Sequence, residues 1–201
     1  MQGDRTGDPT LMDAARGYLR ETYRKPGNVY VAAVHRLDRP VSGIVLLART
    51  SKAASRLTQQ FRDGQVEKGY LALVEAAPAR SEGTIEELLV KDRRTNRVRL
   101  AEPGEAGARG ARLHYRVQPA RPGGVLLEVC PETGRSHQIR VLLASVGSVI
   151  VGDLRYGSRR ELGAMIALHA AFLAFRHPTR AERIEVRSPL PEAWRNLLEV
   201  G

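Results

Sequence analysis

Short β-like runs separated by turn-forming residues dominate the middle of this chain and constrain its fold more than any other feature. From Tyr70 onward, stretches rich in β-branched and apolar residues are interrupted by Gly, Pro and Asn. The runs are "YLALVEA", "GTIEELLVKD", "NRVRLA", "ARLHYRVQPA" and "GVLLEVCPE". Because the links between them are short, neighbouring runs are expected to pair as an antiparallel or mixed sheet.

Helical spacing lies on both sides of this β-rich region. Apolar residues recur at intervals of three and four from Leu11 to Tyr23, in "SKAASRLTQQFRDG" behind Ser51 as a cap, and in "TGRSHQIRVLLASVG". Further short strands are predicted in "VYVAAV", "GIVLLART", "ALHAAFLAF" and "RIEVRS", and a last helix in "LPEAWRNLLEV". Strands and helices without strict alternation indicate an α+β fold, with a mixed, mostly antiparallel sheet and flanking helices.

The length of the chain fits one domain of ordinary size. We therefore expect its 201 residues, 1–201, to form a single domain. The segment "AEPGEAGARGAR", residues 101–112, is rich in Gly and charged residues, and is predicted to be an exposed loop within that domain.

Charge and composition restrict the classes of partner. Lys and Arg number 32 against 22 Asp and Glu, which leaves a net charge of +10, carried mostly by arginines whose planar guanidinium suits phosphate oxygens. A polyanion is therefore the expected partner. No apolar run approaches the roughly 18 residues that cross a bilayer, so no membrane association is expected.

Cysteine usage and the start of the chain favour a cytoplasmic location. Met1 to Arg20 shows no apolar core of a secretory signal, and the single cysteine, Cys130, has no partner for an internal disulfide. Cys130 lies inside a strand-like run and is predicted to be a small strand hydrophobe rather than a nucleophile.

The segment "VHRLDRPVSGIVLLART" raises the most specific chemical question, because Asp38 lies between two arginines at the edge of a strand-like run. The protein-kinase catalytic loop is excluded, since Leu37 separates Arg36 from Asp38 and Gly43 stands where that loop needs Asn. No phosphate-binding glycine motif occurs in a suitable context, and the histidines show no metal-ligand spacing. Neither a nucleotide cofactor nor a metal is therefore predicted.

Two interpretations of Asp38 remain open on the residues alone. It can form an ion pair that fixes a turn, or it can be a functional carboxylate in a cleft beside a cationic partner. Arg140 is a candidate for that cation. In "GRSHQIR", His137 and Arg140 are expected to share one helix face at positions i and i+3, opposite apolar residues such as Leu142.

Several motifs, taken together and in their order, resemble the RluA-type pseudouridine synthases. They are "HRLDRPVSG", "KGYLALV", "TGRSHQIR", "VGDLRYG" and "LHAAFLAFRHP" followed by "PLP". The resemblance spans nearly the whole chain. It is to the family's catalytic domain without an S4 domain, and the strand pair with which that domain usually opens is apparently lacking here.

The resemblance implies a pseudouridine-synthase-like fold with a central RNA-binding cleft. The implied reaction is the isomerisation of specific uridines in ribosomal or transfer RNA, without cofactor or metal, and DNA is not an expected partner. Asp38 matches the catalytic aspartate, Arg140 the arginine that pairs with its carboxylate, and Tyr70 the tyrosine stacked on the target base. The implied RNA-binding residues are Arg36, Lys68, Arg135 and His137.

Some positions depart from the family pattern. Leu142 stands where the family commonly has His, and "GSVI" stands in place of "GHPI". These changes leave Asp38, Tyr70 and Arg140 in place. The alternative function is a non-catalytic RNA-binding or ribosome-assembly factor that retains the synthase fold. Ser42 and Gly43 are expected to shape the turn beside Asp38, with Gly43 adopting backbone angles closed to other residues.

Overall fold

The structure is a computed structural model that describes residues 10–24, 27–92, 94–119, 124–180, 182–194 and 197–198. The chain divides into two compact units, each assembled from three segments. The first unit contains residues 1–39, 45–66 and 174–185, and the second contains residues 40–44, 67–173 and 186–201. Neither unit is continuous in sequence, and the single domain over residues 1–201 stays a prediction.

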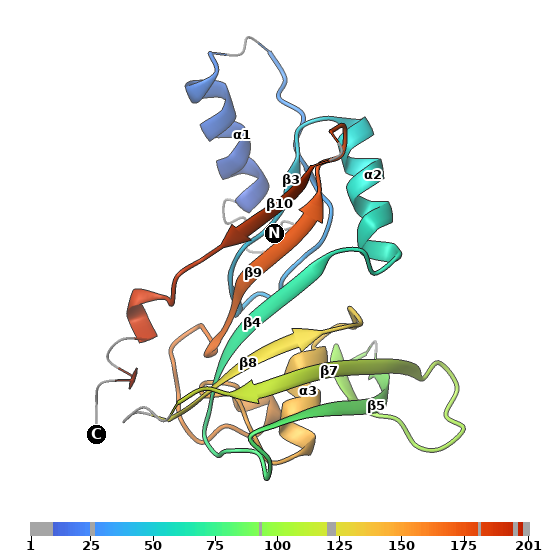
Figure 1. The fold of residues 1–201 in the computed structure, drawn as a ribbon, viewed down its shortest axis with the longest axis vertical. Coiled ribbons are helices and arrows are strands. Elements are labelled where there is room, and N and C mark those ends of the chain that lie inside the picture. Colours follow the sequence, from blue (N-terminus) through green and yellow to red (C-terminus); the bar gives the residue numbers. More distant parts are fainter. Residues whose placement is uncertain are drawn as a thin grey trace. The chain divides into compact units, whose positions relative to one another are not determined.

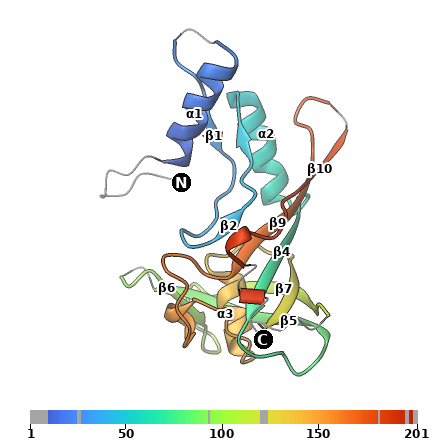
Figure 2. The same cartoon turned by 90° about the vertical axis from the view of Figure 1, so that its left-hand side faces the viewer.

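The first unit contains two helices, a small strand pair, and the end of one longer strand with the start of the next, within residues 174–185 (Figures 1 and 2). The elements are α1 (Leu11–Thr22), β1 (Ala32–Ala33), β3 (Leu47–Ala48) and α2 (Ser51–Arg62), with β1 and β3 antiparallel. One face of α1 buries Leu19 against Val29 and Val31, as its apolar spacing predicts. The cap of α2 differs from the prediction by one residue. Thr50, not Ser51, accepts a hydrogen bond from the Ala53 N–H (3.1 Å), because Thr50 has the extended backbone that an N-cap requires.

The second unit contains most of a mixed sheet with the strand order β10-β9-β4-β8-β7-β5-β6, and β2 pairs with β9 in parallel. The bounds are β2 Ser42–Gly43, β4 Glu67–Val74, β5 Glu82–Asp92, β6 Arg97–Leu100, β7 Arg109–Val117, β8 Val125–Pro131, β9 Leu168–Arg176 and β10 Arg183–Arg187. The helical elements are α3 (Gln138–Ser145) and the short 3-10 turns η1 (Leu154–Tyr156) and η2 (Glu192–Trp194). The α+β fold and the mostly antiparallel sheet are therefore confirmed. Of the last predicted helix, the described part comprises η2 and helical residues 197–198.

Alternation along β7 separates a buried face of the sheet from an exposed one. Ala111 and Leu113 are buried, whereas Arg112 and Arg116 are exposed. On the buried side, α3 lies across β5 and β6 and packs its apolar residues against the sheet (Figure 1). Large fully buried side chains of this core are Leu73, Leu113, Leu127, Leu142, Leu143, Ile150 and Val151.

Gly43 lies at the point where β2 runs beside β9, opposite Ala170. Its φ of +114° is closed to most residues, which confirms the expected role of this glycine. A Cβ atom on Gly43 would lie 2.3 Å from the Ala170 carbonyl oxygen. Next to it, the Ser42 hydroxyl lies 2.8 Å from Nδ1 of the buried His169, so Ser42 and Gly43 both hold β2 beside β9.

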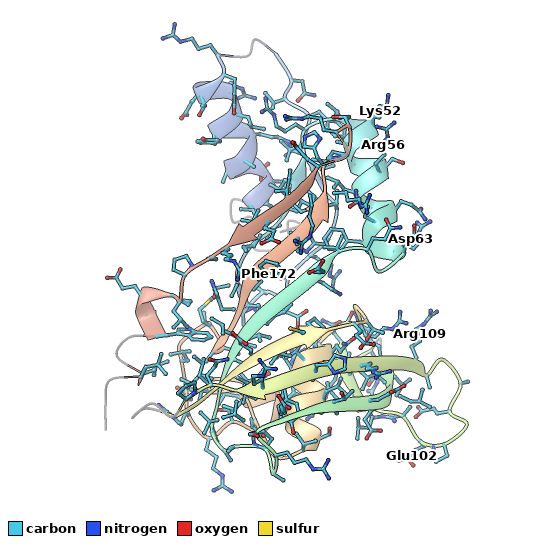
Figure 3. The ribbon with its side chains drawn as sticks, viewed as in Figure 1. Lys52, Arg56, Asp63, Glu102, Arg109 and Phe172 are labelled. Carbon is cyan, nitrogen blue, oxygen red and sulfur yellow. The ribbon has the colours of Figure 1, made fainter. Side chains whose placement is uncertain are left out.

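Two expectations need adjustment in this unit. The loop predicted over residues 101–112 is shorter, because β7 begins at Arg109 and residues 109–112 pair with β5. Figure 3 labels Glu102 and Arg109 near the two ends of this loop. Cys130 is on β8 as expected, but its thiol is exposed rather than packed in the core. Within the described residues, no helix is both long and apolar enough to cross a membrane.

Candidate active site

The segment that carries Asp38 belongs to the first unit and connects β1 to the following strands. Its backbone is held by His35, whose Nε2 accepts a hydrogen bond from the Leu46 N–H (2.8 Å). The His35 ring also stacks on Phe61 of α2, with ring centroids 4.6 Å apart. His35 is thus a structural support. Asp38 is partly buried and Arg36 is exposed, so the side chain of Arg36 is accessible to a ligand.

Strand β4 of the second unit presents Lys68 and Tyr70 on one face, because residues i and i+2 of a strand point to the same side. Tyr70 is the cross-strand partner of Val129 in β8. The Lys68 Nζ donates a hydrogen bond to the Thr133 carbonyl (3.2 Å), and burial lowers the pKa of this amine. The contact joins two of the motifs that the sequence analysis singled out, "KGYLALV" and "TGRSHQIR".

A buried glutamine shapes the turn before α3. The Gln138 Oε1 accepts hydrogen bonds from the Thr133 hydroxyl (2.7 Å) and from the Arg135 backbone N–H (3.0 Å), while its Nε2 donates to the Arg112 carbonyl (3.0 Å). The Arg135 guanidinium donates from Nε to the Gly110 carbonyl (3.0 Å). Gln138 belongs to the motif "TGRSHQIR", but no role was predicted for it from the sequence. Its contacts explain why an amide, which both donates and accepts, occupies this position.

His137 precedes α3 rather than lying on it. It is the N-cap residue, with a left-handed φ of 52°, so the expected helix face shared by His137 and Arg140 is not formed. The imidazole Nδ1 instead lies 2.7 Å from the hydroxyl of Tyr156 in η1. That hydroxyl also accepts a hydrogen bond from the Val98 N–H (3.2 Å). Tyr156 thereby links α3, η1 and β6.

Arg140 is buried and forms a bidentate ion pair with Asp153. Its Nε lies 2.7 Å from Oδ2 of Asp153, and its Nη2 lies 2.8 Å from Oδ1. Arg140 is 5% exposed and Asp153 is 1% exposed, so water is largely excluded from the pair. The Tyr156 ring lies on the same guanidinium, with its centroid 4.9 Å from the Arg140 Cζ. Sequence reasoning missed Asp153, although the quoted motif "VGDLRYG" contains it.

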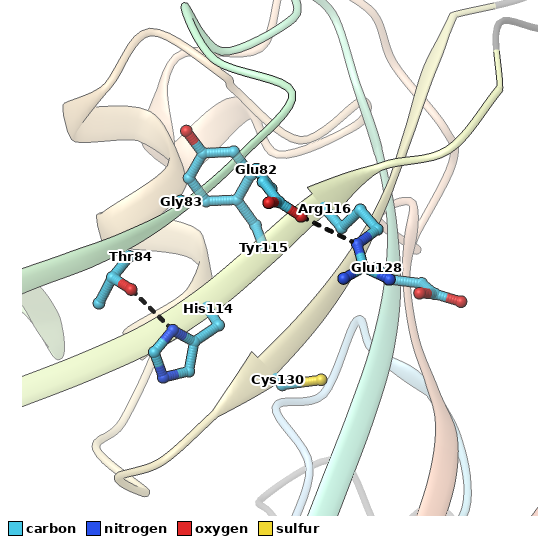
Figure 4. Close-up of a pocket in the computed structure, with 8 residues that line it drawn as sticks. All are labelled: Glu82, Gly83, Thr84, His114, Tyr115, Arg116, Glu128 and Cys130. Carbon is cyan, nitrogen blue, oxygen red and sulfur yellow. Dashed lines mark hydrogen bonds and ion pairs between the residues drawn. The ribbon is translucent and has the colours of Figure 1, made fainter.

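A pocket of about 530 Å³ opens at strands β5, β7 and β8 (Figure 4). Polar groups around it are paired with one another: His114 Nδ1 lies 2.7 Å from the Thr84 hydroxyl, and Arg116 donates to Glu82 (3.2 Å). His114 also contacts Glu132 through Nε2. These contacts describe a solvated sheet face with satisfied side chains, and not a site prepared for a ligand.

Neither a metal cluster nor a thiol with a lowered pKa is found among the described residues. In the part of the chain that the structure describes, no group of three or more His, Cys, Asp or Glu side chains could hold a metal ion. Partial burial raises the pKa of the Cys130 thiol, which lowers the fraction of reactive thiolate at neutral pH. Lys68, Tyr70, Arg135, His137 and Arg140 therefore remain the candidates of the second unit, and Arg36 and Asp38 those of the first.

Comparison with known proteins gives a consistent result. Residues 2–145 match the family described as RNA pseudouridylate synthase. A protein of Chloroflexus aurantiacus named as an uncharacterized RNA pseudouridine synthase is 41% identical over 82% of this chain and 52% of its own length. The ribosomal large subunit pseudouridine synthase D of Zymomonas mobilis is 31% identical over 83% of this chain and 55% of its own length. The chain thus spans about half the length of these relatives.

Solved structures agree with the sequence comparison. The human RNA pseudouridylate synthase domain containing 1 matches with a TM-score of 0.69 and 30% identity, over 85% of this chain and 71% of its own. The human RNA pseudouridylate synthase domain containing 4 matches with a TM-score of 0.73 at 23% identity, which supports the fold. The matched family segment includes Asp38, Tyr70 and Arg140. This chain therefore belongs to the RluA-type family of RNA pseudouridine synthases.

Proposed function

We propose that this protein isomerises specific uridines in RNA to pseudouridine. The observation that carries the proposal is the family match over residues 2–145, a segment that contains Asp38, Tyr70 and Arg140. In the reaction the bond between uracil N1 and ribose C1′ breaks, the base turns over, and a bond between C5 and C1′ forms. The hydrogen on C5 is released to solvent, and N1 gains a proton. No step needs an external oxidant, reductant or cofactor.

Asp38 is the proposed catalytic residue. Its carboxylate either attacks C1′ as a nucleophile or removes a proton from the sugar to give a glycal. Tyr70 stacks on the target base and assists the loss of the C5 proton. Arg140 stabilises the negative charge of the catalytic carboxylate in this assignment, which follows the family pattern.

Ribosomal or transfer RNA is the proposed substrate. The net charge of +10 suits a polyanion, and one relative is named for the large ribosomal subunit. Arg36, Lys68, Arg135 and His137 are the proposed RNA contacts. The exposed Arg36 is available to a phosphate or to the flipped nucleotide, because the target base must leave its stack before the sugar is reached. A single cysteine and an RNA substrate are consistent with a cytoplasmic location.

The test is tritium release from RNA whose uridines carry tritium at C5. We expect the wild-type protein to release tritium into water, and Asp38→Asn to lower the rate by at least about 10³-fold while RNA binding persists. Asp63→Asn is the matched control, because Asp63 is an exposed aspartate at the end of α2 (Figure 3). We expect this control to keep the wild-type rate.

Two results would overturn the proposal. Tritium release that is equal in wild type and Asp38→Asn would remove Asp38 from the chemistry. Tight, salt-sensitive RNA binding without any tritium release would instead identify the protein as a non-catalytic RNA-binding or ribosome-assembly factor.

A further inference from the structure

The buried pair between Arg140 and Asp153 fixes the direction of a side chain that the proposed reaction uses. A guanidinium is planar and rigid, so two hydrogen bonds from Nε and Nη2 to the two oxygens of one carboxylate set the orientation of the whole group. The third nitrogen, Nη1, is thereby aimed as well. A single hydrogen bond or a monodentate ion pair would leave the group free to rotate.

Asp153 is itself held in place by its backbone. Its N–H donates to the Ile150 carbonyl (3.0 Å), and its carbonyl accepts from the backbone N–H groups of Tyr156 (3.0 Å) and Ser158 (3.0 Å). The carboxylate thus projects from a tight turn whose position does not depend on Arg140. This turn is a fixed support against which the arginine can be aligned.

Tyr156 restrains the guanidinium from a second side. Its ring covers Arg140 at 4.9 Å, and its hydroxyl is anchored to Val98 and His137. Arg140 therefore lies between a carboxylate that holds its edge and an aromatic ring that holds its face. Both supports come from the motif "VGDLRYG", which follows α3 in the chain.

A purely stabilising role explains this arrangement poorly. Removing two charges from water costs free energy that the attraction between them often fails to repay, and a pair of apolar residues usually serves a core as well or better. An ion pair that is 5% and 1% exposed is better explained by a need to place a charge. Exposed pairs of the same sheet, such as Arg116 with Glu82, have no such constraint.

We propose that Asp153 is a positioning residue that aligns Arg140 for the isomerisation of uridine. This inference rests on the proposed function, in which Arg140 stabilises the catalytic carboxylate. Asp153 does not touch the substrate. It acts through Arg140, by fixing the direction of the guanidinium and by neutralising part of its charge in the absence of RNA.

Asp153→Asn is the most informative variant, because it keeps the size of the side chain and removes its charge. We expect kcat for tritium release to fall about 10- to 100-fold, and KM for the RNA to change less than about threefold. In an Arg140→Lys background, the same change should lower kcat less than about threefold further, because lysine cannot form the bidentate pair. Glu82→Gln, which breaks an exposed pair, is the control that should leave both constants unchanged.

A second readout does not depend on activity. In ¹⁵N–¹H NMR spectra, the Arg140 Nε–H should give a slowly exchanging signal that disappears in Arg140→Lys and is lost or strongly shifted in Asp153→Asn. Circular dichroism of each variant reports whether it is folded. If Asp153→Asn does not fold, Asp153→Glu keeps the charge but displaces the carboxylate by one methylene group, and kcat should still fall because the bidentate geometry with Arg140 is lost.

Three results would overturn the inference. They are an unchanged kcat in Asp153→Asn, an equal loss in the presence and absence of Arg140, or an Arg140 Nε–H signal that is the same with and without the carboxylate. If the wild-type protein releases no tritium from any RNA, the proposed function fails and the catalytic purpose of Asp153 fails with it. The NMR signal still decides separately whether Asp153 orients Arg140.

Discussion

Replacement of Gly43 by alanine should destabilise the protein through the contact between β2 and β9. The new Cβ would lie 2.3 Å from the Ala170 carbonyl oxygen and 2.5 Å from its backbone nitrogen, and neither backbone atom can move as a side chain could. The φ of +114° is also unfavourable for alanine. The two strands must therefore separate, which breaks the hydrogen bond from the Ile44 N–H to the Ala170 carbonyl (2.9 Å).

The expected loss combines several contributions. Backbone strain costs about 1–3 kcal/mol, overpacking a similar amount, and the broken hydrogen bond about 1 kcal/mol. Alanine also makes the unfolded chain less flexible than glycine does, and this offsets about 0.4–1 kcal/mol of the loss. We therefore expect the free energy of unfolding to fall by about 2–7 kcal/mol, and Tm to fall by on the order of 10 °C for a chain of this length.

The measurement is thermal and urea denaturation followed by circular dichroism. Gly17→Ala is the matched control, because Gly17 lies within α1 with nothing within 4 Å of the added Cβ. There the same change should raise the free energy of unfolding by about 0.5–1 kcal/mol, since alanine is the better helix former. If Gly43→Ala remains within about 1 kcal/mol of the wild type, or if both variants shift in the same direction, the reasoning is wrong.

Two further predictions concern a buried histidine and a partly buried tyrosine of the second unit. Burial lowers the pKa of His169 below its usual 6.5, so the unfolded chain binds the proton more readily, and stability should fall by up to about 1.4 kcal/mol per pH unit as the pH drops below 6.5. Urea denaturation between pH 5 and 8 should show a weaker fall in His169→Gln, and an identical fall would contradict this assignment. Tyr156→Phe removes the acceptor of the Val98 N–H and should cost about 1–3 kcal/mol, measured by the same method. Tyr18→Phe, at a side chain that is 63% exposed, should change little, and equal losses in the two tyrosine variants would argue against the hydroxyl contacts.

Local pattern was sufficient to predict most of the fold. The strand β7 was predicted from its run of β-forming residues between turn-forming ones, and in the structure its residues Ala111 and Leu113 are buried while Arg112 is exposed. The small errors have local causes. Thr50 and Ser51 are both good caps, and the backbone angles that decide between them are not encoded in residue type alone. In "VLLEVCP", Cys130 lies two residues after Glu128, so both side chains point to the exposed face of β8. The apolar character of cysteine had instead favoured the core.

The candidate site was less accessible to sequence reasoning because its partners are set by tertiary placement. Arg140 was a candidate for the cation beside Asp38, but helical spacing cannot reveal that a turn 13 residues later brings Asp153 onto its guanidinium. His137 was placed on the helix, whereas its φ of 52° puts it before the first turn and directs it to Tyr156. The motif "VGDLRYG" was the available signal for both contacts, since it contains both partners.

The exposed thiol of Cys130 makes this protein well suited to single-site labelling. The chain has one cysteine, so a maleimide dye attaches at one defined position without any mutation. Val129 and Cys130 are consecutive strand residues, and Val129 pairs with Tyr70, so the dye would be held on the face of the sheet opposite Tyr70. The raised pKa of the thiol calls for labelling at mildly alkaline pH. A dye at this position could report RNA binding by fluorescence anisotropy while the Tyr70 face stays unobstructed.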